Sequence, residues 1–110
     1  MNVLTLTGRL GDDPVRRDTT KGVVCEFRLA VHGRPRLWIT VVAWGHLAGQ
    51  CAQYLTAGRT VAVSGSLLHD QFLTRAGERA ERWYCKASQI TFLDKPIDDE
   101  ESVDVSVGSE

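Results

Sequence analysis

Hydrophobic and polar residues alternate along five stretches of this chain, as they do in β-strands that bury one face. The alternation is clearest in residues 24–31, where every second residue from Cys25 to Val31 is apolar. The last stretch changes parity near Ser88 and Gln89, which predicts a β-bulge at that point. The five stretches are residues 3–10, 24–31, 37–46, 60–72 and 82–93.

Between the third and fourth stretches, the apolar residues recur with the period of a helix. The recurring residues, at positions i, i+4, i+7 and i+8, are Leu47, Cys51, Tyr54 and Leu55. They form one face of a helix, and Gly58 lies where a glycine would end it. The chain therefore predicts an all-β domain with one helix between strands three and four.

Five short strands with one interposed helix favour a closed barrel, because closure removes the open edges of a sheet. The OB-fold is a five-stranded barrel of this kind. A doubly wound α/β fold would need alternating helices, and a β-sandwich normally has about seven strands and no helix in mid-chain. The pattern therefore predicts a five-stranded OB-fold barrel.

The third stretch carries two tryptophans, Trp38 and Trp44, on the face opposite to its aliphatic residues. Because a domain of this size has one core, the aliphatic face is expected to be buried and both indoles to point outward. Tryptophan is seldom left exposed, so burial of the rings in an interface is the alternative.

Charge divides the chain of 110 residues into two parts. Beyond Pro96 there are six acidic residues and no basic one, which leaves 8 acidic and 13 basic residues, a net charge of +5, in residues 1–96. We expect residues 1–96 to form one domain that binds a polyanion. Residues 97–110 contain few large apolar side chains and are expected to be a disordered acidic tail.

Several other classes of protein are disfavoured. No run approaches the ~18 apolar residues of a membrane span, and the N-terminus lacks the apolar stretch of a signal peptide, so we expect a cytoplasmic protein. The three cysteines contain no CxxC pair and are expected to be buried thiols. The histidines do not fall at metal-ligand spacing, so neither a metal nor a cofactor is expected.

Three segments of the chain together resemble a known family. GRLGDDPVRR follows the first strand, FRLAV closes the second, and WITVVAWGHLAGQCAQYLTAGRTVAVSGSL spans the third strand to the fourth. Over about residues 2–94, they resemble the bacterial single-stranded-DNA-binding proteins. The resemblance implies an OB-fold protomer that forms a homo-oligomer, a tetramer in preference to a dimer, and binds single-stranded DNA of any sequence.

The resemblance also implies which side chains contact DNA. In the family, bases stack on aromatic residues at the positions matched by Trp38, Trp44 and Phe72, whereas Trp83 lies outside these positions and is expected to pack. A basic groove would add affinity by releasing counterions from the phosphates. The candidates for phosphate contacts are Arg9, Arg16, Arg17, Lys21, Arg34, Arg36, Arg75 and Lys86.

The chain departs from the family in its loops and tail. HGRPR replaces a long hairpin between strands two and three, and the acidic tail ends in VSVGSE in place of an acidic Pro-Phe tip. An acid lies near Phe72 in LLHDQF, and Ile39 stands where some members have a histidine that supports tetramer assembly. These departures concern DNA contact, assembly and the recruitment of other proteins.

The leading hypothesis is a nucleoid-associated protein that protects single-stranded DNA during replication, recombination or repair, whose proteins are further candidate partners. The alternative is a primosomal-type OB-fold interaction module, dimeric and weak in nucleic-acid binding. RNA is also an alternative to DNA, because stacking hardly distinguishes the two. An enzyme built on Cys51 and His46 is disfavoured, since these residues lie on different faces of the helix.

Overall fold

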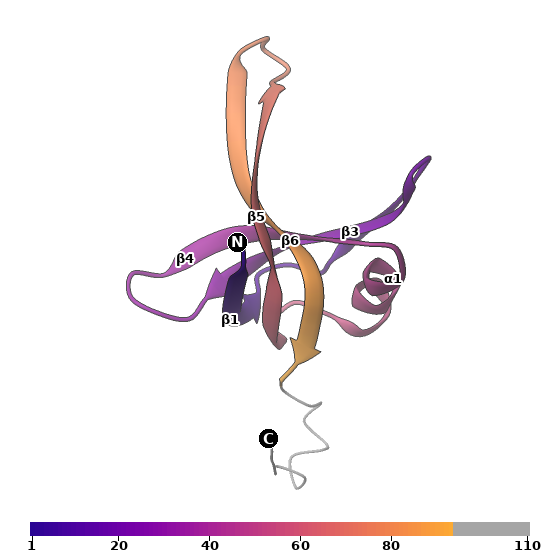
Figure 1. Ribbon diagram of the computed structural model, residues 1–110, viewed down its shortest axis with the longest axis vertical. Coiled ribbons are helices and arrows are strands. Elements are labelled where there is room, and N and C mark those ends of the chain that lie inside the picture. The colour runs from indigo at the N-terminus through magenta and orange to yellow at the C-terminus, as the bar shows by residue number, and fades with distance from the viewer. Residues whose placement is uncertain (94–110) are drawn as a thin grey trace, which may run out of the picture.

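The computed structural model describes residues 1–93, which form six strands and one helix (Figure 1). The predicted acidic tail, residues 97–110, and the predicted domain boundary at residue 96 lie outside the described residues. The elements are β1 (Leu4–Leu10), β2 (Val15–Thr19), β3 (Gly22–Val31), β4 (Leu37–Trp44), α1 (Gly45–Tyr54), β5 (Thr60–Leu73) and β6 (Arg79–Phe92).

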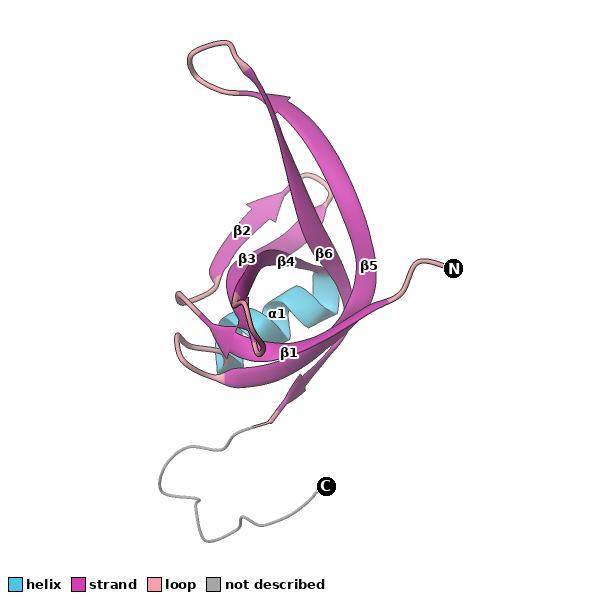
Figure 2. Ribbon diagram, turned by 90° about the vertical axis from the view of Figure 1, so that its left-hand side faces the viewer, coloured by secondary structure: helices cyan, strands magenta, loops and turns pink. Residues whose placement is uncertain are grey.

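The strands form one strongly curved sheet with the order β1-β5-β6-β4-β3-β2 (Figure 2). In addition, β1 pairs with β3, so five of the strands form a closed ring of pairings and β2 lies outside it. All pairs are antiparallel except β4 with β6. The helix α1 connects β4 to β5, where the pattern of the sequence predicted it.

The sixth strand, β2, corrects the prediction of five strands. It pairs along its whole length with the start of β3, and all five of its residues are exposed. Neither face of β2 contributes to the core, so apolar and polar residues do not alternate along it and no periodic pattern marks the strand. A turn closes the hairpin: the Thr19 hydroxyl donates a hydrogen bond to the Gly22 carbonyl oxygen (2.7 Å), and Gly22 adopts a φ of 126°.

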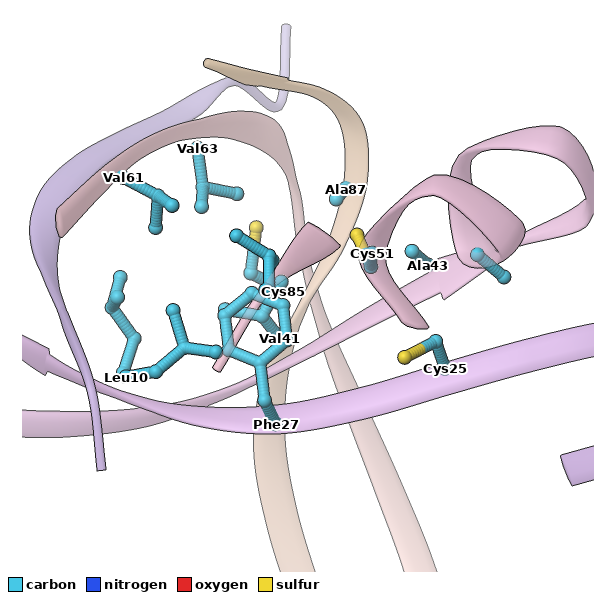
Figure 3. Packing of buried hydrophobic residues seen from close by; sticks show 13 residues of the cluster. Leu10, Cys25, Phe27, Val41, Ala43, Cys51, Val61, Val63, Cys85 and Ala87 are labelled. Atoms are coloured by element: carbon cyan, nitrogen blue, oxygen red, sulfur yellow. The ribbon is translucent and has the colours of Figure 1, made fainter. Parts of the chain in front are cut away.

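The core consists of small and branched apolar side chains together with the ring of Phe27 (Figure 3). All three cysteines are fully buried free thiols, as the sequence predicts. Burial raises the pKa of each thiol, and that of Cys51 to about 12, so the thiols stay protonated and act as small apolar groups. The core residues are Leu10, Cys25, Phe27, Leu29, Val41, Ala43, Ala48, Cys51, Leu55, Val61, Val63, Cys85 and Ala87.

The helix ends before the position that Gly58 was predicted to set. It ends at Tyr54, whose ring is half-exposed, and the buried positions of this segment are Ala48, Cys51 and Leu55. Gly58 lies beyond the helix in a turn, with a φ of 89°, and its N–H donates to the Leu10 carbonyl oxygen (2.8 Å). This glycine therefore shapes the entry into β5 and does not end α1.

The predicted β-bulge is confirmed at Ser88. Ser64 of β5 lies opposite Gln89 of β6 and Gly65 lies opposite Ala87, so Ser88 is the extra residue. The Ser88 hydroxyl donates to the Ser64 carbonyl oxygen (3.0 Å). A Cβ atom at Gly65 would lie 2.1 Å from the Lys86 carbonyl oxygen, so this position requires glycine.

Beyond the ring, β5 and β6 continue as a two-stranded arm that protrudes from the body of the molecule (Figure 1). We call residues 69–73 and 79–83, which lie beyond the pairing of β6 with β4, the arm; its last paired residues are Leu73 and Arg79.

Candidate nucleic-acid interface

The two tryptophans of β4 lie on the outside of the sheet. Trp38 is 49% exposed and Trp44 is 40% exposed, whereas Val41 and Ala43 on the other face are fully buried. This is the outward orientation that the strand parity predicts. We call the outer side of the sheet that carries both indoles the tryptophan face.

Trp38 is surrounded by the segment that follows β1. A Cβ atom at Gly11 would lie 2.5 Å from Cζ3 of the indole, so the ring lies directly against the Gly11 backbone. The Arg28 guanidinium carbon lies 5.1 Å from the ring centroid, which is a cation–π arrangement. Two hydrogen bonds of 3.1 Å join this guanidinium to the Asp12 carboxylate.

Trp44 lies at the junction of sheet and helix. It is the last residue of β4 and the N-cap residue of α1, with extended backbone angles. Its partner in β3 is Val24, and two residues earlier Val42 lies opposite Glu26. Val24 and Val42 are buried although they are not part of the interior cluster, so they form an apolar floor on the tryptophan face.

Phe72, the third predicted stacking residue, is on the arm and is 47% exposed. It lies opposite Ala80 of β6, and four residues further along β6 Tyr84 pairs with Thr40 of β4. Paired residues point to the same face and the side-chain period along a strand is two. The register therefore assigns Phe72 to the tryptophan face as well.

Trp83 points to the opposite face of the arm, because it is one residue away from Tyr84. The expectation that Trp83 packs is wrong for the protomer, since 58% of the residue is exposed. Its ring contacts that of His69, with 4.5 Å between the ring centroids. The sequence could not show this, because the inward face of β6 continues past the barrel, where no core covers it.

Three of the eight predicted phosphate-binding residues share the tryptophan face. Arg9 and Trp38 both pair with Ala30, and Lys86 pairs with Val42. The third is Arg17, which is in β2.

Arg17 of β2 lies opposite Val24, which in turn lies opposite Trp44. Its neighbour Arg16 points to the other face of β2 and forms an ion pair of 3.3 Å with Asp18. The structure therefore separates Arg16 from the tryptophans. The remaining four candidates lie in turns and loops at the margin: Lys21, Arg34, Arg36 and Arg75.

Two arginines of the tryptophan face were missing from the predicted set. Arg28 lies between buried residues of β3 and points outward. Arg82 is two residues before Tyr84 and points to the same face, with its guanidinium carbon 4.9 Å from the centroid of the Tyr84 ring. The alternation of side chains along a strand could have identified both, since each occupies an outward position of its strand.

Carboxylates accompany these arginines. Glu26 forms ion pairs with Arg17 (3.3 Å) and Arg82 (3.5 Å), and Asp12 binds Arg28. Asp12, Arg17, Glu26 and Arg28 are among the residues that line an open cleft of about 320 Å³. The hydrogen bond from Arg28 lowers the pKa of the Asp12 carboxyl and raises that of the guanidinium, so both groups stay charged. A phosphate that approaches this face therefore competes with carboxylates.

Within residues 1–93, no cluster of three or more His, Cys, Asp or Glu side chains could hold a metal ion. The same part of the chain contains no helix of the length and apolarity that a membrane crossing requires.

The architecture is similar to that of a solved structure, the small single-stranded DNA-binding protein from Streptomyces coelicolor. The TM-score is 0.71 at 27% sequence identity, and the match covers 84% of this chain and 95% of the other. Residues 1–93 match the single-strand binding protein family. The chain belongs to that family, and family membership places it among binding proteins rather than enzymes.

Curated relatives support this assignment. The chain is 37% identical over 103 residues to the single-stranded DNA-binding protein of Caldanaerobacter subterraneus, a match covering 86% of this chain and 69% of the relative. It is 40% identical over 78 residues to single-stranded DNA-binding protein 1 of Chlorobaculum tepidum, which covers 61% of this chain. In that case the match spans about half, 48%, of the relative's length.

Proposed function

We propose that this protein binds single-stranded DNA without sequence preference and protects it during replication, recombination or repair. The observation that carries the proposal is the exposure of Trp38 and Trp44 on one sheet face, over an apolar floor. Every base has a π-face, so stacking on such rings accepts any sequence. The names of the relatives, which are single-stranded DNA-binding proteins, support the same function.

In this proposal, bases stack on Trp38, Trp44 and Phe72, each stack contributing ~1–3 kcal/mol. The basic side chains of the tryptophan face contact the phosphates between the stacked nucleotides. Because these contacts release counterions from the DNA, the affinity falls as the salt concentration rises. Arg9, Arg17 and Lys86 are the first candidates because they share that face by register. The residues at the margin, Lys21, Arg34, Arg36 and Arg75, would extend the path, with Arg16 the least favoured.

We further infer that the ring of five strands is an OB-fold, to which β2 is an addition. The pairing of β1 with both β5 and β3, and the place of α1 between β4 and β5, support this assignment. The folded domain would extend to residue 96, with residues 97–110 as a separate acidic tail. Reduced, buried thiols suit a protein that works with the nucleoid in the cytoplasm.

We also propose that the protomer forms a homo-oligomer, a tetramer in preference to a dimer, with closed symmetry. Large apolar side chains outside the stacking set, among them Leu37, Leu73 and Leu93, are at least half-exposed in the single chain. Burial of such residues against another copy of the chain would remove them from water.

The test is binding of a fluorescein-labelled dT oligomer, measured by anisotropy beside a mixed-sequence strand and a duplex of equal length. The two single strands should bind similarly and the duplex far more weakly. The variant Trp44→Ala should lose ~1–3 kcal/mol of binding free energy while its melting temperature changes little. Absence of binding to both single strands would contradict the proposal and favour an interaction module.

A further inference from the structure

The Asp12–Arg28 pair lies beside a ring on which a base is proposed to stack. The Arg28 guanidinium lies over the Trp38 indole, and its Nε and Nη2 atoms donate to the two oxygens of Asp12. Both donors are on one edge of the guanidinium, the edge that also binds two oxygens of a phosphate. The Asp12 carboxylate therefore occupies the position that a DNA phosphate would take on Arg28.

The fold does not depend on the Asp12 side chain in the way that it depends on the next residue. The Asp13 carboxylate accepts a hydrogen bond from the Ala57 N–H (2.8 Å), which ties the segment after β1 to the turn before β5. The segment is also attached to β3 through its backbone, since the Gly11 N–H donates to the Arg28 carbonyl oxygen (2.9 Å). The Asp12 carboxylate can thus leave Arg28 while the segment keeps its place.

Exchange of the carboxylate for a phosphate costs little free energy. The side chains of Arg28 and Asp12 are 58% and 50% exposed, so the pair is open to water. Exposed ion pairs contribute little to stability, because water screens the attraction and both side chains lose freedom. The lowered pKa of Asp12 keeps its carboxylate charged at neutral pH, so anion competition governs the pair rather than protonation.

We propose that Asp12 is an internal competitor for Arg28, and that a phosphate of bound single-stranded DNA displaces it beside the base stacked on Trp38. This inference rests on the proposed DNA binding. Arg28 is then a phosphate-binding residue, and Asp12 is a residue that limits affinity. The carboxylate thus restrains the binding strength of this chain without being needed for its fold.

The experiment measures the affinity for a dT oligomer over a series of salt concentrations. Asp12→Asn should bind about three to ten times more tightly than wild type at low salt, and the difference should shrink as salt weakens the competing Asp12–Arg28 pair. Arg28→Gln should bind more weakly with a shallower slope. In the Arg28→Gln background, the gain from Asp12→Asn should disappear, since no guanidinium remains to be released.

Asp18→Asn is the matched control. It also removes one exposed carboxylate from an Asp–Arg pair, here the 3.3 Å pair with Arg16 on the other face of β2, and should change the affinity little. Melting temperatures of all variants should stay within a few degrees of wild type.

Three results would overturn the inference while leaving DNA binding intact. Asp12→Asn could bind no more tightly than Asp18→Asn, it could bind more weakly than wild type, or its gain could persist without Arg28. The last result would mean that Asp12 acts only as a general negative charge. A wild-type protein that binds no single-stranded DNA would overturn both the proposed function and this inference.

Discussion

The indole of Trp38 lies so close to Gly11 that a single added methyl group would fall 2.5 Å from its ring. The two residues are 27 positions apart in the chain, and the glycine belongs to the turn that follows β1. Any larger residue at this position would therefore force the exposed ring to move.

Gly11→Ala should displace the Trp38 ring and weaken binding to a dT oligomer by ~1–3 kcal/mol, the contribution of one stacked base. Gly49→Ala is the control, because a Cβ at Gly49 in α1 meets no atom within 4 Å. The control should bind like wild type and gain ~0.5–1 kcal/mol of stability from the higher helix propensity of alanine. Wild-type affinity in Gly11→Ala would show that the position of the Trp38 ring does not matter for binding.

Assembly can be tested by the mass of the protein in solution. Light scattering at micromolar concentration should give a multiple of the 12.2 kDa chain, four in preference to two. Leu73→Glu is an informative variant, since Leu73 is strongly exposed at the end of the arm in the single chain. A monomeric mass for the wild-type protein would contradict the proposed homo-oligomer.

The buried thiols predict a loss of stability at alkaline pH. Their pKa values in the folded protein lie above the ordinary value near 9, that of Cys51 at about 12, so ionisation favours the unfolded chain. The free energy of unfolding should be insensitive to these groups below about pH 9. Between pH 9 and 12 it should fall by up to ~1.4 kcal/mol per pH unit for Cys51, and the other two thiols should add to the fall just above pH 9.

Cys51→Ala isolates the effect, because it keeps a small apolar side chain and removes the thiol with the most strongly raised pKa. Its urea denaturation curves should shift less between pH 9 and pH 11 than those of wild type. An equal shift in both proteins would mean that the Cys51 thiol contributes nothing to the pH dependence.

The acidic residues beyond Pro96 should reduce DNA binding. They place six negative charges and no positive one on the same chain as the basic domain, where they compete with DNA at a high local concentration. A protein that ends at Pro96 should bind a dT oligomer modestly more tightly at low salt, and the difference should shrink as salt screens the charges. Equal affinity of the two proteins at low salt would rule out this competition.

The parts of the fold that border the core could be predicted from the sequence. In β3 and β4, one face is buried, so the alternation of side chains revealed both the strands and the outward direction of the two indoles. The bulge at Ser88 was visible as a change of parity. β2 was not predicted because both of its faces are exposed. It pairs with β3 through backbone hydrogen bonds, which leave no pattern in the side chains.

The contacts around the aromatic residues were less predictable from the sequence than the aromatic residues themselves. Arg28 contacts Asp12, 16 residues earlier, and Trp38, ten residues later, and no periodic pattern reports such contacts. Likewise, the exposure of Trp83 follows from the length of the arm beyond the barrel. Side-chain direction follows from local parity, whereas partners across the sheet follow from register and from the turns that join the strands.

The central claim, that Trp38 and Trp44 are the rings on which bases stack, is tested most directly by tryptophan fluorescence during titration with poly-dT. The variant Trp83→Phe retains both rings of the tryptophan face, and the variant Trp38→Phe/Trp44→Phe retains only Trp83, on the other face of the arm. We predict that poly-dT strongly quenches the emission of the first variant and leaves that of the second nearly unchanged. Quenching of Trp83 alone, or unchanged emission of Trp83→Phe under conditions where it binds poly-dT, would contradict the account.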